Sequence, residues 1–158
     1  MKISINKVRD VLTPDLRSRI SKAAAPKRAL EAMGTTVVSM TKRAFGQPSL
    51  RPASWPALKP ATLKAKKAKG YGSQPLRASG TLSMSPRVVT VTAKTVTVGS
   101  DRKVGTHSLA AIHQQGTKDG RIPARPFFPF DKSGNITERG KRNVLAAAKA
   151  ALDSELPR

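Results

Sequence analysis

Prolines divide the middle of this 158-residue chain and limit the structures it can form. Between residues 46 and 80 they stand at Pro48, Pro52, Pro56, Pro60 and Pro75. Proline lacks a backbone N–H and its ring clashes with the preceding helical turn, so it interrupts helices and is excluded from central strands. We therefore expect neither a continuous helix nor a central strand here. Residues 46–75, which we call the basic segment, are predicted to form a long protruding loop or arm.

The basic segment carries cations without compensating acids. No Asp or Glu occurs between residues 35 and 100. Within the segment, residues 61–69 could form a short helix. The cationic side chains in and near it are Lys59, Lys64, Lys66, Lys67 and Lys69. Two interpretations remain open: a solvated loop, or an arm that orders on assembly when a partner supplies the contacts.

The charge of the whole chain points to a polyanionic environment. Lys and Arg total 30 against 9 acids, which gives a formal net charge of +21. Such an imbalance costs stability through self-repulsion, and mixed signs would serve solubility better. The expected partner is DNA, an acidic protein or both, and composition does not separate them. No zinc finger, recognition helix or RNA-binding strand motif is recognisable, so any DNA contact would be nonspecific.

Cysteine usage and hydropathy indicate the cellular compartment in which the protein is made. The chain has no Cys, which excludes disulfides and thiolate metal sites. No apolar run approaches the roughly 20 residues of a membrane span, and the first residues lack the apolar core of a signal peptide. We expect a protein made in the cytosol, with no membrane contact.

Periodicity predicts an α+β fold in a single domain over residues 1–158. Thr13-Pro14-Asp15 is typical of a helix start, and a second helix is expected from Pro26 to about Phe45. Its apolar stripe is Leu30, Met33, Val37, Met40 and Ala44. From Leu82 to residue 100 the period becomes two, which predicts a small antiparallel sheet with a turn at Ala93-Lys94.

The remaining elements complete this prediction. Residues 109–114 are expected to form a short helix or turn, and residues 127–130 an edge strand. A last helix starts at Thr137, a good N-cap. Its stripe is Val144, Ala148, Leu152 and Leu156. The N-terminal and C-terminal helices are expected to pack on the sheet, with the basic segment outside.

The residues of a type used in catalysis indicate a structural role instead of a catalytic one. His113 has no acid or nucleophile at a recognisable spacing, and with His107 it does not make a zinc site. We interpret His113 as structural, hydrogen-bonding backbone in a turn that Gly116 ends in a left-handed conformation. A phosphate loop and a dinucleotide motif are absent, so we expect no enzyme activity, no cofactor and no metal.

Three residues are candidates for contacts with a partner. Trp55, the only Trp, stands beside Pro56 and could anchor in its own subunit or the next. Arg125 lies between Pro123 and Pro126 in an extended frame and is predicted to contact a neighbouring subunit's carboxylate or carbonyls. Phe127 is expected in the core and Phe128 at the interface.

Five short motifs, in order over roughly residues 26–130, resemble one family. They are Trp55-Pro-Ala-Leu58, Ala61-Thr-Leu63, Ala78-Ser-Gly-Thr-Leu82, Ala110-Ala-Ile-His-Gln-Gln-Gly116 and Ile122-Pro-Ala-Arg-Pro-Phe-Phe128. This pattern is similar to the phage virion morphogenesis family, the tail-completion proteins of tailed phages. Two positions depart from it: Leu109 stands where the family usually has Tyr, and Gln115 where it has an aromatic residue.

The resemblance implies a structural protein of the phage neck or tail end. Such a protein would complete the tail or join it to the head during assembly in the host bacterial cytoplasm, and would remain in the virion. Its partners would be neighbouring neck and tail proteins and copies of itself in a ring, expected to be a hexamer. The alternative, from a different class, is a small nonspecific DNA-binding protein, which the charge favours.

Overall fold

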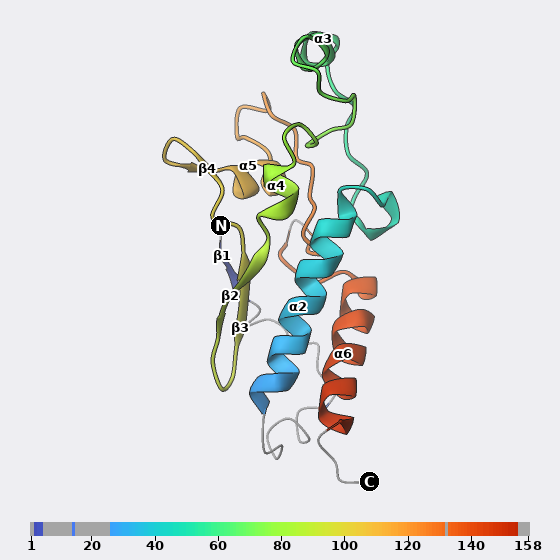
Figure 1. Ribbon diagram of the computed structural model, residues 1–158, viewed down its shortest axis with the longest axis vertical. Helices are drawn as coiled ribbons and strands as arrows, with labels where there is room; N and C mark the ends of the chain where they lie inside the picture. The colour runs from blue at the N-terminus through green and yellow to red at the C-terminus, as the bar shows by residue number, and fades with distance from the viewer. Residues whose placement is uncertain (1, 5–13, 15–25, 132, 155–158) are drawn as a thin grey trace.

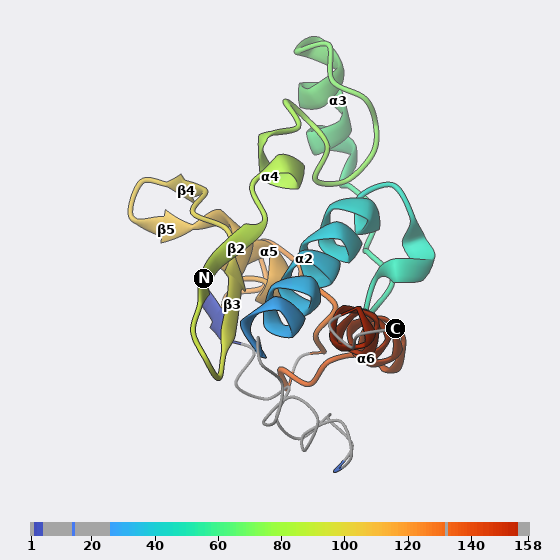
Figure 2. The same ribbon diagram turned by 60° about the horizontal axis from the view of Figure 1, so that its bottom comes forward.

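Two long helices and a small sheet make up the body of the protein. The computed structural model describes residues 2–4, 14, 26–131 and 133–154. Helix α2 (Pro26–Ala44) lies between the sheet on one side and α6 (Glu138–Asp153) on the other (Figure 1, Figure 2). The predicted α+β class is confirmed.

Helix α2 is the centre of this arrangement. It begins at Pro26, as predicted, because the first turn of a helix needs no N–H at that position. All five residues of its predicted apolar stripe are buried. Gly34 is buried too, and a Cβ there would lie 2.6 Å from Val96 Cγ2 and 3.1 Å from Val88 Cγ2. The missing side chain therefore lets the helix backbone approach the sheet closely.

The sheet is antiparallel, with strand order β1-β3-β2. It consists of β1 (Lys2–Ser4), β2 (Arg87–Val91) and β3 (Val96–Gly99). The β2–β3 hairpin turns at the predicted place, where Thr92 N donates to Thr95 O at 2.8 Å. A register shift lies between Val88 and Thr90.

The sheet differs from the prediction in its extent. Leu82 belongs to a short helix, α4 (Thr81–Met84), and the strand starts only after Pro86, which interrupts the backbone donors. No sequence pattern indicated β1, nor the two-stranded sheet of β4 (Lys103–Val104) and β5 (His107–Ser108). These strands are too short to show an alternating pattern.

Helix α6 confirms the C-terminal prediction. The Thr137 hydroxyl accepts from Gly140 N at 3.2 Å, as an N-cap should. Val144, Ala148 and Leu152 are buried. Leu156 lies outside the described residues, as does nearly all of the helix expected from residue 13.

The basic segment is not a continuous loop. It contains a 3-10 helix, η2 (Pro48–Leu50), and α3 (Pro60–Ala68), which lies apart from α2 and α6 at the top of Figure 1. The short helix predicted at residues 61–69 is confirmed. Pro48 and Pro60 each stand at the first position of their helix, where proline is favoured, so these prolines begin structure as well as interrupt it.

Aromatic side chains fill the core between these elements. Phe127 is fully buried, with ring centroids 4.9 Å from Phe45 and 5.0 Å from Phe128. The expected edge strand at residues 127–130 is only an isolated bridge, Phe130 with Ile136. The reason is Pro129, which removes a donor from the middle of that stretch.

Candidate functional site

Gln114 joins the two motif-bearing segments, residues 110–116 and 122–128, which we call the paired segments. It lies on α5 (Leu109–Gln115), whose start is capped by Ser108. Its side chain is buried, and its Oε1 accepts from both Phe127 N and Phe128 N at 3.1 Å. Its Nε2 donates to Phe128 O at 3.4 Å and to Phe130 O at 3.2 Å. One amide thus satisfies backbone groups that strand pairing would otherwise satisfy.

Sequence reasoning missed Gln114. The available signal was its place in the motif from Ala110 to Gly116, where it follows His113 and precedes a second glutamine. That pattern does not reveal which backbone groups the amide meets, because those groups come from a different segment. The function of this residue is set by tertiary structure.

Gly116 ends α5 and brings the paired segments together. Its N–H donates to Ile112 O at 2.7 Å, and its φ is +79°, a region that favours glycine. A Cβ there would lie 2.9 Å from Ala124 N and 3.0 Å from Ile122 O. The predicted left-handed conformation is wrong, because φ is positive but ψ is −179°. The close approach of the second segment is an additional requirement for glycine.

Arg125 connects the paired segments to the basic segment. Its side chain is buried, with Nε donating to Pro56 O at 3.0 Å and Nη2 to Ala57 O at 3.1 Å. Burial lowers the pKa of its guanidinium from the ordinary value. We expected a neighbouring subunit to bind Arg125. The structure instead directs its fork to carbonyls of its own chain, because the basic segment folds back over it.

Trp55 makes a second connection of the same kind. Its indole Nε1 donates to Pro126 O at 2.8 Å, and its ring packs edge-on against Phe45, with centroids 5.8 Å apart. The Arg51 guanidinium lies 3.7 Å from the Trp55 ring centroid. Of the two locations considered for this anchor, the structure shows the one within the chain.

The prediction that Phe128 lies at an interface is wrong. Its relative exposure is 0%, and it belongs to the core cluster with Phe127. An interface contact needs side-chain surface that another protein can reach. Phe128 offers none in this structure, because Gln114 holds its backbone inward.

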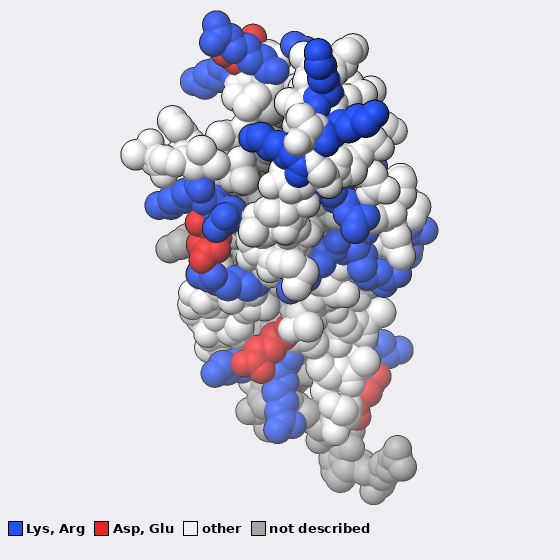
Figure 3. Space-filling view, turned by 45° about the horizontal axis from the view of Figure 1, so that its top comes forward, with Lys and Arg blue, Asp and Glu red and all other residues white. Residues whose placement is uncertain are grey.

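The cationic side chains of α3 differ in their surroundings. Lys64, Lys67 and Lys69 are exposed, and basic side chains gather over this end of the molecule (Figure 3). Lys66 instead donates from Nζ to Gln74 O at 3.0 Å and also to Arg77 O. Partial burial lowers the pKa of Lys66. One of the four predicted partner lysines therefore holds the segment together.

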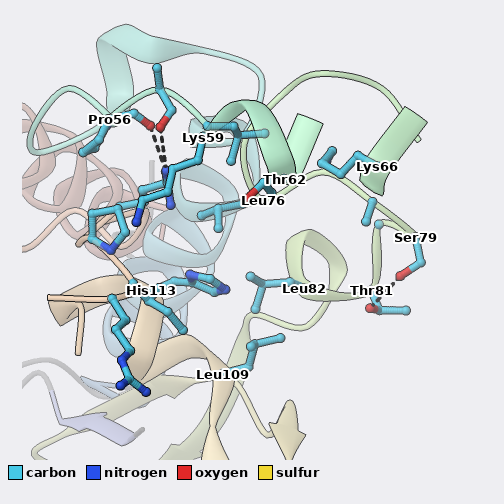
Figure 4. A pocket seen from close by; sticks show the side chains of 18 of the residues that line it. Pro56, Lys59, Thr62, Lys66, Leu76, Ser79, Thr81, Leu82, Leu109 and His113 are labelled. Carbon is cyan, nitrogen blue, oxygen red and sulfur yellow. Dashed lines mark hydrogen bonds between the residues drawn. The ribbon is translucent and has the colours of Figure 1, made fainter. Parts of the chain in front are cut away.

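A cleft of about 630 Å³ lies between α3, α4, α5 and the loop at residues 120–123. Leu82, Leu109 and His113 face it from the body of the protein, with Lys59 and Thr62 on the opposite side (Figure 4). His113 O accepts from Arg125 N at 2.6 Å. Its buried Nδ1 has no hydrogen-bond partner in the described part of the chain. Burial lowers the pKa of His113, and the charge of Arg125 lowers it further.

No group of three or more His, Cys, Asp or Glu side chains among the described residues could hold a metal ion. No helix in the described ranges is long and apolar enough to cross a membrane.

Comparison with known proteins agrees with the motif pattern. The model of the phage virion morphogenesis family matches residues 3–153. Comparison with curated proteins and with solved structures gave no match. The match includes the paired segments, Trp55 and α3, and it extends over nearly the whole sequence. This chain therefore belongs to the phage virion morphogenesis family.

Proposed function

We propose that this protein completes the phage tail or joins it to the head, as a non-enzymatic component of the neck or tail end. The observation that carries the proposal is the family match over residues 3–153, which gives a role in phage structure or assembly. We further propose that the chain is assembled in the host cytoplasm and stays in the virion.

The position of α3 supports contact with other subunits. None of its residues is buried. The backbone just before α3 is nevertheless held in place, because Arg125 donates to Pro56 O and Ala57 O, and Trp55 donates to Pro126 O. A helix that buries little in its own chain gains stability from tertiary packing elsewhere. We propose that neighbouring copies or neck and tail proteins supply that packing, in a ring of six subunits.

Deletion of the gene from the phage tests this function. We expect heads and tails to accumulate unjoined, and a plasmid copy of the wild-type chain to restore infectious particles. Electron microscopy of restored particles carrying a tagged chain should place the tag at the tail end, and native mass spectrometry should give the ring size. Joined particles in the absence of the gene, or purified particles without the chain, would contradict the proposal.

Nonspecific DNA binding is the second candidate. The specific observation in its favour is the exposed Lys64, Lys67 and Lys69, in a part of the chain without acids. Phosphate contacts of this kind release counterions and weaken as salt rises. The salt dependence of binding to duplex DNA therefore separates this function from a purely protein-directed one.

A further inference from the structure

The cleft beside α3 combines an apolar wall with cationic side chains. Leu76, Leu82 and Leu109 give it apolar surface. Lys59, Lys66 and Arg125 bring positive charge to the same space. No Asp or Glu is among the described residues that line it. A further lining cation, Arg121, pairs with Asp119 at 3.3 Å on the exposed loop.

The charges in the cleft face neutral groups. Lys66 and Arg125 donate to backbone carbonyls, which offset their desolvation only in part. An incoming carboxylate would be attracted to both and to Lys59 at the start of α3. The ligand that complements this site is therefore anionic.

Two details indicate that the site can accept polar and apolar groups together. The buried Nδ1 of His113 has no partner in the described chain and can form one more hydrogen bond. Leu76 has a φ of 60°, a conformation that is strained for a side chain other than glycine. Such strain persists where the surrounding structure enforces it, and Leu76 is one of the residues that line the cleft.

We propose that this cleft binds an extended acidic peptide segment that inserts one apolar side chain between Leu76, Leu82 and Leu109 and places carboxylates against Lys59 and Lys66. The inference rests on the proposed function for the source of the peptide, a neighbouring virion protein. A DNA duplex fits less well, because its phosphates lie on a convex surface and have no group to bury against three leucines.

NMR spectra that resolve the imidazole signals of the full chain test the proposal directly. The probes are three short synthetic peptides: an acidic one with a central leucine, an acidic one with a central serine, and a glutamine version that keeps the leucine. We expect the first to move the ring signals of His113 and to leave those of His107, which is exposed on β5. Removing the leucine or the charges should weaken binding about tenfold or more.

Matched charge variants distinguish binding in the cleft from attraction to the overall positive charge of the chain. Lys59→Glu should weaken binding of the acidic leucine peptide by about tenfold, and Lys59→Gln by less. Lys103→Glu makes the same charge change on β4, outside the cleft, and should leave the affinity within about twofold. Unchanged His113 signals in the free variants show that the fold is intact.

Three results would overturn the proposal: His113 signals that no peptide moves, equal weakening by Lys59→Glu and Lys103→Glu, or the same His113 shifts on adding a short DNA duplex. Because these measurements use the purified chain, they do not depend on its role in the virion. The gene-deletion experiment tests that role separately, so failure of the cleft and failure of the proposed function are distinguishable.

Discussion

At Gln114 a single side chain connects backbone that is up to 16 residues away. Its amide meets two N–H groups and two carbonyl oxygens of the stretch from Phe127 to Phe130. Pro126 and Pro129 interrupt the backbone donors around this stretch and limit regular strand pairing. A side chain with both donors and acceptors is therefore required where a strand would otherwise provide them.

We predict that Gln114→Leu lowers the free energy of unfolding by about 2 kcal/mol or more, because buried backbone groups each cost about 1–3 kcal/mol when unpaired. Gln115→Leu is the matched control, since Gln115 is exposed on the same helix. Urea unfolding of the two variants and the wild type measures the difference. Equal losses of stability for both variants would show that the hydrogen bonds of Gln114 contribute little.

His113 should make stability depend on pH. Its pKa is below the ordinary 6.5 because of burial and Arg125, so the folded state holds the imidazole neutral. As pH falls through 6.5, the unfolded chain takes up the proton first, and stability decreases until the folded state also protonates. The stability that the neutral imidazole of His113 contributes is fully present at pH values above the pKa of this group in the unfolded chain.

The corresponding variant is His113→Gln, which removes the titration. Its free energy of unfolding should fall less than that of the wild type between about pH 7 and 5. Chemical unfolding across that range tests the prediction, and parallel curves for His113→Gln and the wild type would refute it.

At the scale of elements, the end of α5 determines how the paired segments meet. Gly116 and Gly120 both have positive φ, +79° and +69°. A Cβ at Gly116 would meet Ala124 N at 2.9 Å, whereas at Gly120 nothing lies within 4 Å among the described residues. The two glycines therefore share a conformational requirement and differ in the space around them.

Gly116→Ala should consequently destabilise the protein more than Gly120→Ala. The conformational cost of about 1 kcal/mol is common to both, and the backbone clash at Gly116 adds to it. We expect a clearly lower melting temperature for Gly116→Ala, measured by circular dichroism. If the two variants melt together, the approach of residues 122–124 to Gly116 is adjustable.

At the scale of the whole molecule, basic side chains are spread over the surface, and several of them gather at the end that carries α3 (Figure 3). Replacing Lys64, Lys67 and Lys69 by Gln should leave folding unchanged, because these side chains are exposed. If this end of the molecule binds duplex DNA, the log–log salt slope should flatten by roughly 0.9 for each phosphate that the variant no longer neutralises.

The control for this triple variant removes the same charge elsewhere, at Lys94, Lys103 and Lys149, which are also exposed. Fluorescence anisotropy with labelled duplex DNA gives the slopes. Equal slopes for both triple variants would mean that DNA contact, if any, follows net charge and not α3. Negligible DNA binding with failed tail joining would identify an acidic protein as the target of α3.

Much of the fold could be predicted because its elements have local causes. The stripe of α2, the Thr137 cap and the turn after Thr92 each depend on residues close to each other along the chain. The strands β1, β4 and β5 could not be predicted, since two or three residues carry no period. Their pairing partners define them.

The candidate site was predicted in part. The motifs identified the paired segments and the family, and the positive φ of Gly116 followed from its place after a helix. The partners of Arg125 and Trp55 did not follow. Both residues look equally suited to a neighbour or to their own chain until the path of the basic segment is known.

The sequence by itself determined α2 and α6, the central hairpin, the excess of positive charge and the family, because periodicity, capping, composition and motif order are properties of neighbouring residues. Only the tertiary structure decided which polar groups are buried and what they meet. Gln114, Arg125 and Trp55 reach backbone atoms 13 to 71 residues away. Such contacts depend on how prolines redirect the chain, and a backbone carbonyl is present at every residue, so no sequence pattern marks the one that will be bound.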